Sequence, residues 1–204
     1  MKVYLIRHAQ SEENTLSLRA TASIRAYNAI VRESSTSPLT NRGIDQAHAV
    51  AQQFVDKPLE RIYSSPYLRA LDTATVIGQS LGLTPEIVDD LREVMPRTLS
   101  ERHRDGPLGR HIFRAYFSML WTGGSDESWA TSYQRAKRAW SQITGQEAQA
   151  IIAVAHRGLI GLILLALRRD PRWQIVKRDL NNCGVSLVVR RDPQSTNYGE
   201  KDHK

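Results

Sequence analysis

The chain has 204 residues, of which 41% are hydrophobic and 24% charged, and its formal net charge is +7. This length fits one domain of ordinary size with a core of its own, and the composition excludes a disordered or fibrous protein. The single cysteine, Cys183, excludes an internal disulfide framework. It favours a reducing, cytoplasmic location.

The positive charge is concentrated at residues 97–114, 135–138 and 168–191. Such an excess favours anionic partners, although arginine runs with few aromatic residues among them are also typical of solvated basic faces. The most hydrophobic stretch, residues 151–167, has His156 and Arg157 in its interior, so no membrane-spanning helix is expected. The chain begins with a strand pattern and not with a secretory leader.

Alternating apolar residues predict strands, and a 3.6-residue apolar spacing between capping and breaking residues predicts helices. In the first half these patterns predict a strand over residues 2–9, a helix within 15–37, a helix from Thr40 to before Pro58, a strand over 61–64, a helix over 67–81 with Leu68 facing the core, and a strand over 85–88.

The pattern degrades in the middle of the chain, where prolines and glycines interrupt it and only residues 112–121 suggest a helix. We interpret residues 94–128 as an inserted cap or active-site loop region. A single domain over residues 1–190 and a polar tail over 191–204 are therefore expected. The remaining elements are a helix over 129–143, a strand over 150–155, a helix over 158–167 and a strand over 185–189.

Strands that alternate with helices predict an α/β fold, a three-layer sandwich in which helices cover both faces of a largely parallel sheet. Ligands of such sheets bind at the carboxyl ends of the strands. Three predicted strand ends carry polar pairs of interest: Arg7 with His8, Ser64 with Ser65, and His156 with Arg157.

A neutral imidazole is a competent nucleophile near pH 7, and a neighbouring arginine suggests that its electrophile is a phosphoryl group. Arg69 lies in the helix after Ser64 and Ser65, where it could reach back to the strand ends; the alternative is a surface arginine on an amphipathic helix. His48, His103, His111 and His203 are interpreted as structural or surface residues, and their spacing matches no metal-binding pattern.

Several ordered blocks resemble the histidine phosphatase superfamily, which includes phosphoglycerate mutases and many small bacterial phosphatases. The blocks are Arg7-His8-Ala9 with Gln10, Ser11 and Asn14; Pro38-Leu39-Thr40 with Arg42-Gly43; Ser64-Ser65-Pro66 with Arg69-Ala70 and Thr73-Ala74; Leu91-Arg92-Glu93; Glu127-Ser128; Ala155-His156-Arg157-Gly158; and Asn182 with Val185. The chain departs from the family pattern at Ala9, which replaces a glycine, and in the segments 14–38 and after Glu93.

The resemblance implies a phosphoglycerate mutase-like sandwich that needs no metal or cofactor. In it, His8 would attack phosphorus, and Arg7, Arg69 and His156 would surround the phosphoryl oxygens. Asn14 and the Ser11 hydroxyl would add neutral donors to the substrate. Glu93 would protonate the leaving group, which requires a raised pKa; the alternative for Glu93 is a surface carboxylate paired with Arg92 or Arg97.

The leading functional hypothesis is a metal-independent phosphatase that hydrolyses phosphate monoesters through a phosphohistidine, an acid-phosphatase-type phosphomonoesterase. A phosphoglycerate mutase-type phosphotransferase shares all its catalytic residues. A third hypothesis is a phosphate- or nucleic-acid-binding protein on the same scaffold.

The expected partner is a phosphorylated small molecule, with no membrane and no nucleic acid; a second anionic group of the substrate could contact Arg97, Arg102, Arg104, Arg110 or Arg114. The sequence predicts no oligomeric state.

Overall fold

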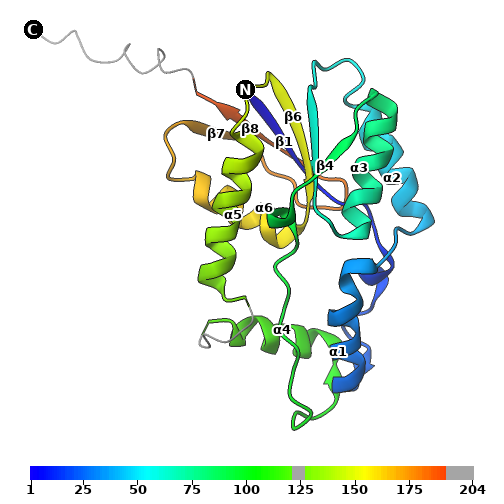
Figure 1. Ribbon diagram of the computed structural model, residues 1–204. Coiled ribbons are helices and arrows are strands. Elements are labelled where there is room, and N and C mark those ends of the chain that lie inside the picture. The colour runs from blue at the N-terminus through cyan, green and yellow to red at the C-terminus, as the bar shows by residue number, and fades with distance from the viewer. Residues whose placement is uncertain (121–126, 192–204) are drawn as a thin grey trace, which may run out of the picture.

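The computed structural model describes residues 1–120 and 127–191. A central sheet carries helices on both faces, and a smaller lobe lies beyond the carboxyl ends of its parallel strands (Figure 1). The helices are α1 (Ile24–Glu33), α2 (Asn41–Gln52), α3 (Leu68–Leu81), α4 (Leu108–Ser118), α5 (Trp129–Thr144) and α6 (Arg157–Leu167), with short 3-10 turns η1 (Glu12–Thr15), η2 (Ser34–Thr36) and η3 (Asp89–Leu91). No helix within the described part of the chain is both long and apolar enough to cross a membrane.

The main sheet has six strands in the order β4-β3-β6-β1-β8-β7. The first four run parallel, and the last two are antiparallel to their neighbours. This arrangement confirms the predicted α/β sandwich with a largely parallel sheet. The strands of this sheet are β1 (Lys2–Arg7), β3 (Arg61–Ser64), β4 (Pro85–Ile87), β6 (Ala150–Ala155), β7 (Trp173–Lys177) and β8 (Val185–Arg190), and a separate ribbon pairs β2 (Thr21–Ala22) with β5 (Gly106–Pro107).

Each face of the sheet has its own core. Successive side chains of a strand point to opposite faces, so Leu5 of β1 packs with α5 and α6, whereas Ile6 packs with α2 and α3. Both residues are completely buried. Because both faces are covered, the central strands are continuous apolar runs, as buried parallel strands usually are.

The smaller lobe joins two segments that are distant in sequence. In Figure 1, α1 and α4 lie together at the end of the molecule to which the carboxyl end of β1 points. The Asn28 side chain donates to the Leu99 carbonyl (2.9 Å) and accepts from the Leu99 N–H (2.8 Å). Ile24, Tyr27 and Leu108 belong to a third apolar cluster within this lobe. The segment after Glu93 therefore packs on the segment between β1 and α2.

The structure corrects three details of the predicted elements. The helix expected from residue 112 begins at Leu108, directly after Pro107; its expected end, Trp121, lies outside the described residues, as does the tail from 192. Leu68 is 36% exposed and does not face the core, because α3 turns Arg69 and Ala70 inward instead. Strand β7 was not predicted, because only two of its five residues, Trp173 and Ile175, are apolar and face inward. Basic residues beside them obscure the alternation.

Candidate active site

The polar pairs at the strand ends lie along one edge of the sheet. Strand β6 lies between β1 and β3, so the residues that follow these three parallel strands are neighbours. A cavity of about 130 Å³ opens at this edge. Arg7, His8, Asn14, Arg69 and Glu93 all line it. Arg7 and Glu93, which are 86 positions apart in the chain, thus meet in one small space.

Hydrogen bonds hold the His8 ring in one neutral form, in which Nδ1 is protonated and Nε2 is not. Its Nδ1 lies 2.7 Å from the Ala9 carbonyl oxygen, which can only accept, so Nδ1 carries the proton. Its Nε2 therefore presents a lone pair, and the Arg69 Nε–H points at it from 3.1 Å. Burial, followed by the positive charge of Arg69, lowers the pKa of His8 to about 3. The ring is consequently uncharged at neutral pH, as a nucleophile must be.

Arg69 is not a surface arginine: only 3% of the residue is exposed. Besides His8, its guanidinium donates to the Ser34 carbonyl and lies 3.5 Å from the Glu13 carboxylate. The Ser34 hydroxyl donates to the same carboxylate at 2.6 Å. These contacts fix a positive charge beside His8, which is the arrangement that a phosphoryl group requires.

His156 lies against His8, with their ring centroids 5.1 Å apart. Its Nε2 is 2.8 Å from the Ser65 hydroxyl, which accepts the N–H of Tyr67 at 3.2 Å and can donate its own hydrogen to Nε2, so that Nδ1 carries the ring proton. Its Nδ1 is buried and has no hydrogen-bond partner within residues 1–120 and 127–191. Burial and the charge of Arg69 lower the pKa of His156 well below its usual value. A neutral His156 with a free Nδ1–H could donate to a bound phosphoryl oxygen.

The Glu93 carboxylate lies at the N-terminus of α6. One of its oxygens accepts the N–H groups of Val94 (2.8 Å) and Leu159 (3.3 Å), and the other accepts the N–H of Gly158 at 3.5 Å. Burial raises the pKa of Glu93, while these N–H groups and the charge of Arg69 oppose the rise. A carboxyl group with a raised pKa is suited to proton transfer.

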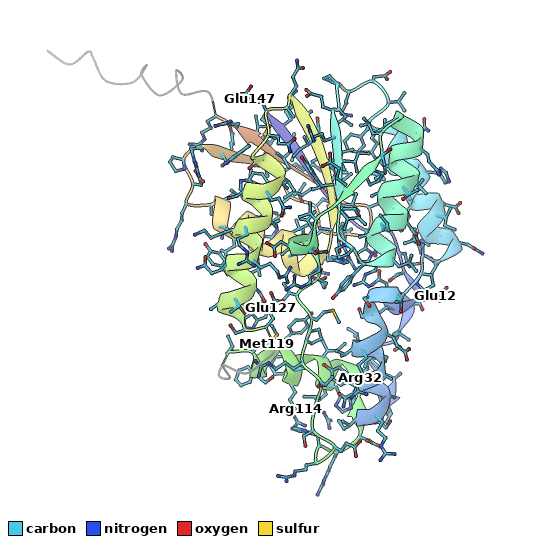
Figure 2. All side chains as sticks on the ribbon, viewed as in Figure 1. Glu12, Arg32, Arg114, Met119, Glu127 and Glu147 are labelled. Carbon is cyan, nitrogen blue, oxygen red and sulfur yellow. The ribbon has the colours of Figure 1, made fainter. Side chains whose placement is uncertain are left out.

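Arg135 of α5 holds the segment that carries Glu93, and the sequence did not single it out. Its side chain is 1% exposed and donates to the carbonyls of Asp90 (2.9 Å), Arg92 (2.6 Å) and Glu93 (3.1 Å). Two further bonds of 2.5 and 2.8 Å reach the carboxylate of Glu127, which Figure 2 labels near the start of α5. Arginine in an amphipathic helix normally faces solvent, so nothing local to Arg135 indicated this ion pair.

Asn182 connects the two loops that frame His8. Its side-chain N–H groups donate to the His8 carbonyl (3.1 Å) and to Asn14 Oδ1 (2.9 Å). Since Asn14 Oδ1 also accepts the Ser11 N–H at 3.3 Å, the Asn14 NH₂ remains as a donor at the cavity. Ser11 itself is completely buried and does not line the cavity. The structure therefore brings Asn14, but not the Ser11 hydroxyl, to the space beside His8.

The remaining departures from the expected pattern are accommodated. Ala9 is completely buried, its N–H donates to the Thr73 hydroxyl at 3.0 Å, and it does not have a positive φ. Its methyl group therefore needs no strained backbone.

Arg7 donates to the Leu180 carbonyl at 3.1 Å, and its buried Nε has no partner within the described residues. No three histidine, cysteine, aspartate or glutamate residues gather as a metal site in the described part of the chain.

An α/β sandwich of this topology is that of the phosphoglycerate mutase-like enzymes. The family model of the histidine phosphatase superfamily (branch 1) matches residues 3–198, and the chain belongs to this superfamily. The family predicted from the ordered sequence blocks is thereby confirmed.

Curated relatives include proteins named for two different activities. "Putative phosphoserine phosphatase 2" of Hydrogenobacter thermophilus is 27% identical over 202 residues, which covers 96% of this chain and 92% of that protein. "Probable phosphoglycerate mutase GpmB" of Yersinia pestis is 35% identical over 105 residues, which covers 52% of this chain and 43% of that protein.

Solved structures share the fold at low identity. The phosphoglycerate mutase of Bacillus anthracis superposes with a TM-score of 0.66 at 18% identity, and the match covers 93% of this chain and 88% of that one. A mycobacterial glucosyl-3-phosphoglycerate phosphatase gives a TM-score of 0.65 at 21% identity, with 91% and 90% of the two chains covered.

Proposed function

We propose that this protein is a metal-independent phosphatase that hydrolyses a phosphate monoester through a phosphohistidine on His8. The observation that carries the proposal is the His8 ring, whose Nδ1 is held by the Ala9 carbonyl and whose Nε2 faces the Arg69 guanidinium at 3.1 Å. The Arg69 guanidinium donates to the lone pair of His8 Nε2, and an entering phosphoryl group would take over this hydrogen bond through one of its oxygens, which would release Nε2 to attack phosphorus.

In the first step His8 Nε2 attacks phosphorus, and the bond from phosphorus to the ester oxygen breaks. Arg7, Arg69 and His156 hold the three non-bridging oxygens and stabilise the charge that develops on them. The Asn14 NH₂ adds a neutral donor, and Ser11 supports Asn14 from behind. The leaving alkoxide takes the proton of Glu93, so that an alcohol departs.

In the second step a water molecule attacks the phosphohistidine. Its proton passes to the Glu93 carboxylate, the phosphorus–nitrogen bond breaks, and inorganic phosphate leaves a restored neutral His8. Glu93 thus changes from acid to base within one cycle, which a carboxyl group with a raised pKa can do near neutral pH. Fixed cations supply the charge stabilisation that a metal ion provides elsewhere.

A phosphoglycerate mutase would use the same residues but must also bind the carboxylate of its substrate. Among the described residues that line the cavity, the only cations are Arg7 and Arg69, both of which the phosphoryl group needs. This shortage favours hydrolysis over transfer between phosphoglycerates. A nucleic-acid-binding protein on this scaffold would have no use for a neutral, buried His8.

The test is the variant His8→Asn, assayed with a phosphate monoester and by denaturation at alkaline pH, which traps a phosphoenzyme that is stable in base and labile in acid. We expect turnover and the phosphoenzyme to disappear together, by a factor of at least about 10³ in rate. The matched control is His48→Asn, because His48 is an exposed histidine of α2, and it should behave as wild type. Wild-type turnover by His8→Asn would refute the proposal, and salt-sensitive nucleic-acid binding without turnover would favour the binding hypothesis.

We also infer that the protein works in the reducing cytoplasm on a small phosphorylated molecule. Its only cysteine, Cys183, is partly buried, and burial raises the pKa of its thiol to about 12. A chain with a single cysteine cannot form an internal disulfide, which suits a reducing compartment.

A further inference from the structure

The cavity beside His8 has two ends of different chemistry. One end holds the charged and amide groups described above. The other end lies within the smaller lobe and is formed by apolar and aromatic residues: Tyr27, Ile30, Val31, Met95, Pro96, Leu108, Ile112 and Tyr116. In a phosphate monoester, the group beyond the ester oxygen would lie against this second end.

The two tyrosines do not offer their donor hydrogens to the cavity. The Tyr27 hydroxyl donates to the Arg97 carbonyl at 2.8 Å, and the Tyr116 hydroxyl donates to the Val94 carbonyl at 3.0 Å. Burial raises the pKa of both phenols, so they stay uncharged. Their rings therefore act as apolar walls, and polar recognition of the leaving group at this end is weak.

The charge balance of the cavity disfavours a second anionic group. Arg7 and Arg69 face the two negative charges of a bound phosphoryl group, and the Glu13 carboxylate already lies 3.5 Å from Arg69. None of the five arginines expected to contact a second anion lines the cavity: Arg97, next in sequence to the cavity-lining Pro96, is partly buried, the other four are exposed, and Figure 2 shows Arg114 on the lobe remote from the sheet; the other exposed residues are Arg102, Arg104 and Arg110. A carboxylate on the leaving group would gain no cation and would meet Glu13.

We propose that the substrate class is the phosphate monoesters of small, uncharged, apolar alcohols, with the leaving group bound between α1 and α4. This inference rests on the proposed phosphatase activity. The cavity of about 130 Å³ is smaller than the roughly 300–1,000 Å³ of pockets that enclose drug-sized ligands. It accommodates a short chain or one ring, and its apolar end stabilises the group by removing it from water.

The experiment compares n-alkyl phosphates from methyl to hexyl with 3-phosphoglycerate, phosphoserine and phosphoethanolamine. Unbranched primary alcohols are similar leaving groups, so a change in kcat/KM along the series reports contact with the cavity and not a change in chemistry. We expect kcat/KM to rise about three- to fourfold per methylene until the chain leaves the cavity. Butyl phosphate should exceed each of the three charged substrates at least tenfold.

A variant tests the site directly. Val31→Thr keeps the shape of a cavity-lining side chain but replaces a methyl group with a hydroxyl, so it should flatten the dependence of kcat/KM on chain length. Val176→Thr is the matched control, because Val176 is 55% exposed on β7 and does not line the cavity. Thermal unfolding of both variants separates a loss of folding from a loss of contact.

The outcomes distinguish the two proposals. If wild type hydrolyses no ester above the His8→Asn background, the phosphatase itself is refuted. If it hydrolyses esters through His8 but kcat/KM is flat along the alkyl series, the apolar site is wrong and the phosphatase stands. A preference for 3-phosphoglycerate or phosphoserine would overturn the charge argument, and a preference for phosphoethanolamine would show that Glu13 binds cations.

Discussion

Replacing Arg135 with lysine tests how the catalytic acid is positioned. Arg135 makes three bonds to the carbonyls of Asp90, Arg92 and Glu93 and two to the Glu127 carboxylate. A lysine has one nitrogen, which cannot reach both sets of acceptors from the same position. Breaking a buried ion pair of this kind costs about 3–5 kcal/mol, a large part of the roughly 5–15 kcal/mol of an average domain, so Arg135→Lys should fold with a lower melting temperature.

The effect on catalysis should depend on the leaving group. A shift of the Glu93 segment by about 1 Å would cost on the order of 100-fold in kcat/KM for an alkyl phosphate, whose alkoxide must be protonated as it leaves. An activated ester such as p-nitrophenyl phosphate releases a stable phenolate and needs no proton from Glu93 in this first step. We therefore expect its kcat/KM, which reports formation of the phosphoenzyme and not its hydrolysis, to fall less than fivefold, which a general loss of structure would not produce.

The control is Arg138→Lys, one turn along α5. Arg138 binds the Asp90 carboxylate at 3.1 Å but its side chain is 62% exposed, so the pair contributes about 0–1 kcal/mol and does not touch the Glu93 carbonyl. Because Arg135→Lys could unfold, Glu127→Gln provides a milder second variant that keeps the three carbonyl bonds. Equal losses for alkyl and aryl esters in Arg135→Lys, or no loss for either, would refute the positioning role.

Three further predictions concern the acid, its titration and the core. Gly158→Ala should reduce kcat for alkyl phosphates at least tenfold, because a Cβ there would lie 2.7 Å from Glu93 Oε1; unchanged steady-state kinetics would contradict this placement. The plot of kcat/KM against pH should be level in mild acid, because burial lowers the pKa of His8 to about 3. Its value should fall as pH rises through the raised pKa of Glu93, which must be protonated in the first step. Glu93→Gln should remove that alkaline fall, and its persistence would assign it to another group. Ile152→Ala should lower the free energy of unfolding by about 2–5 kcal/mol in urea titrations, because Ile152 of β6 is completely buried in the core that the sheet forms with α2 and α3. A loss below about 1 kcal/mol would mean that neighbouring side chains fill the space left by the smaller residue.

Local patterns were sufficient to predict most of the fold and to place Arg7 and His8 at a strand end, whereas Glu93 and Asn14 were implied only by the family resemblance; all four residues line one cavity together with Arg69. Alternation and capping are short-range signals, and in a parallel sheet the strand ends meet whatever the loops do. Thr40 illustrates the point, since its hydroxyl accepts the Gly43 N–H at 3.0 Å and begins α2 where the sequence placed the cap.

Long-range pairing was beyond the sequence. Nothing local to Asn28 indicates that it binds Leu99, 71 residues away, and this pairing joins the two segments of the smaller lobe. Arg135 likewise resembles any polar helical residue until its five acceptors are seen. The catalytic roles of the site residues, including that of Ser11 behind Asn14, remain predictions for the experiments above.

The Asn182 bond to the His8 carbonyl has a consequence for the newborn chain. The two residues are 174 positions apart, and β1 lies between β6 and β8, both of which are made late. At about 5–20 residues per second, roughly 10–35 s of translation separate the synthesis of His8 from that of its anchor. A ribosome-bound chain therefore carries His8 in an unassembled loop, and the phosphotransfer proposed for this residue would begin only when the last strand closes the sheet.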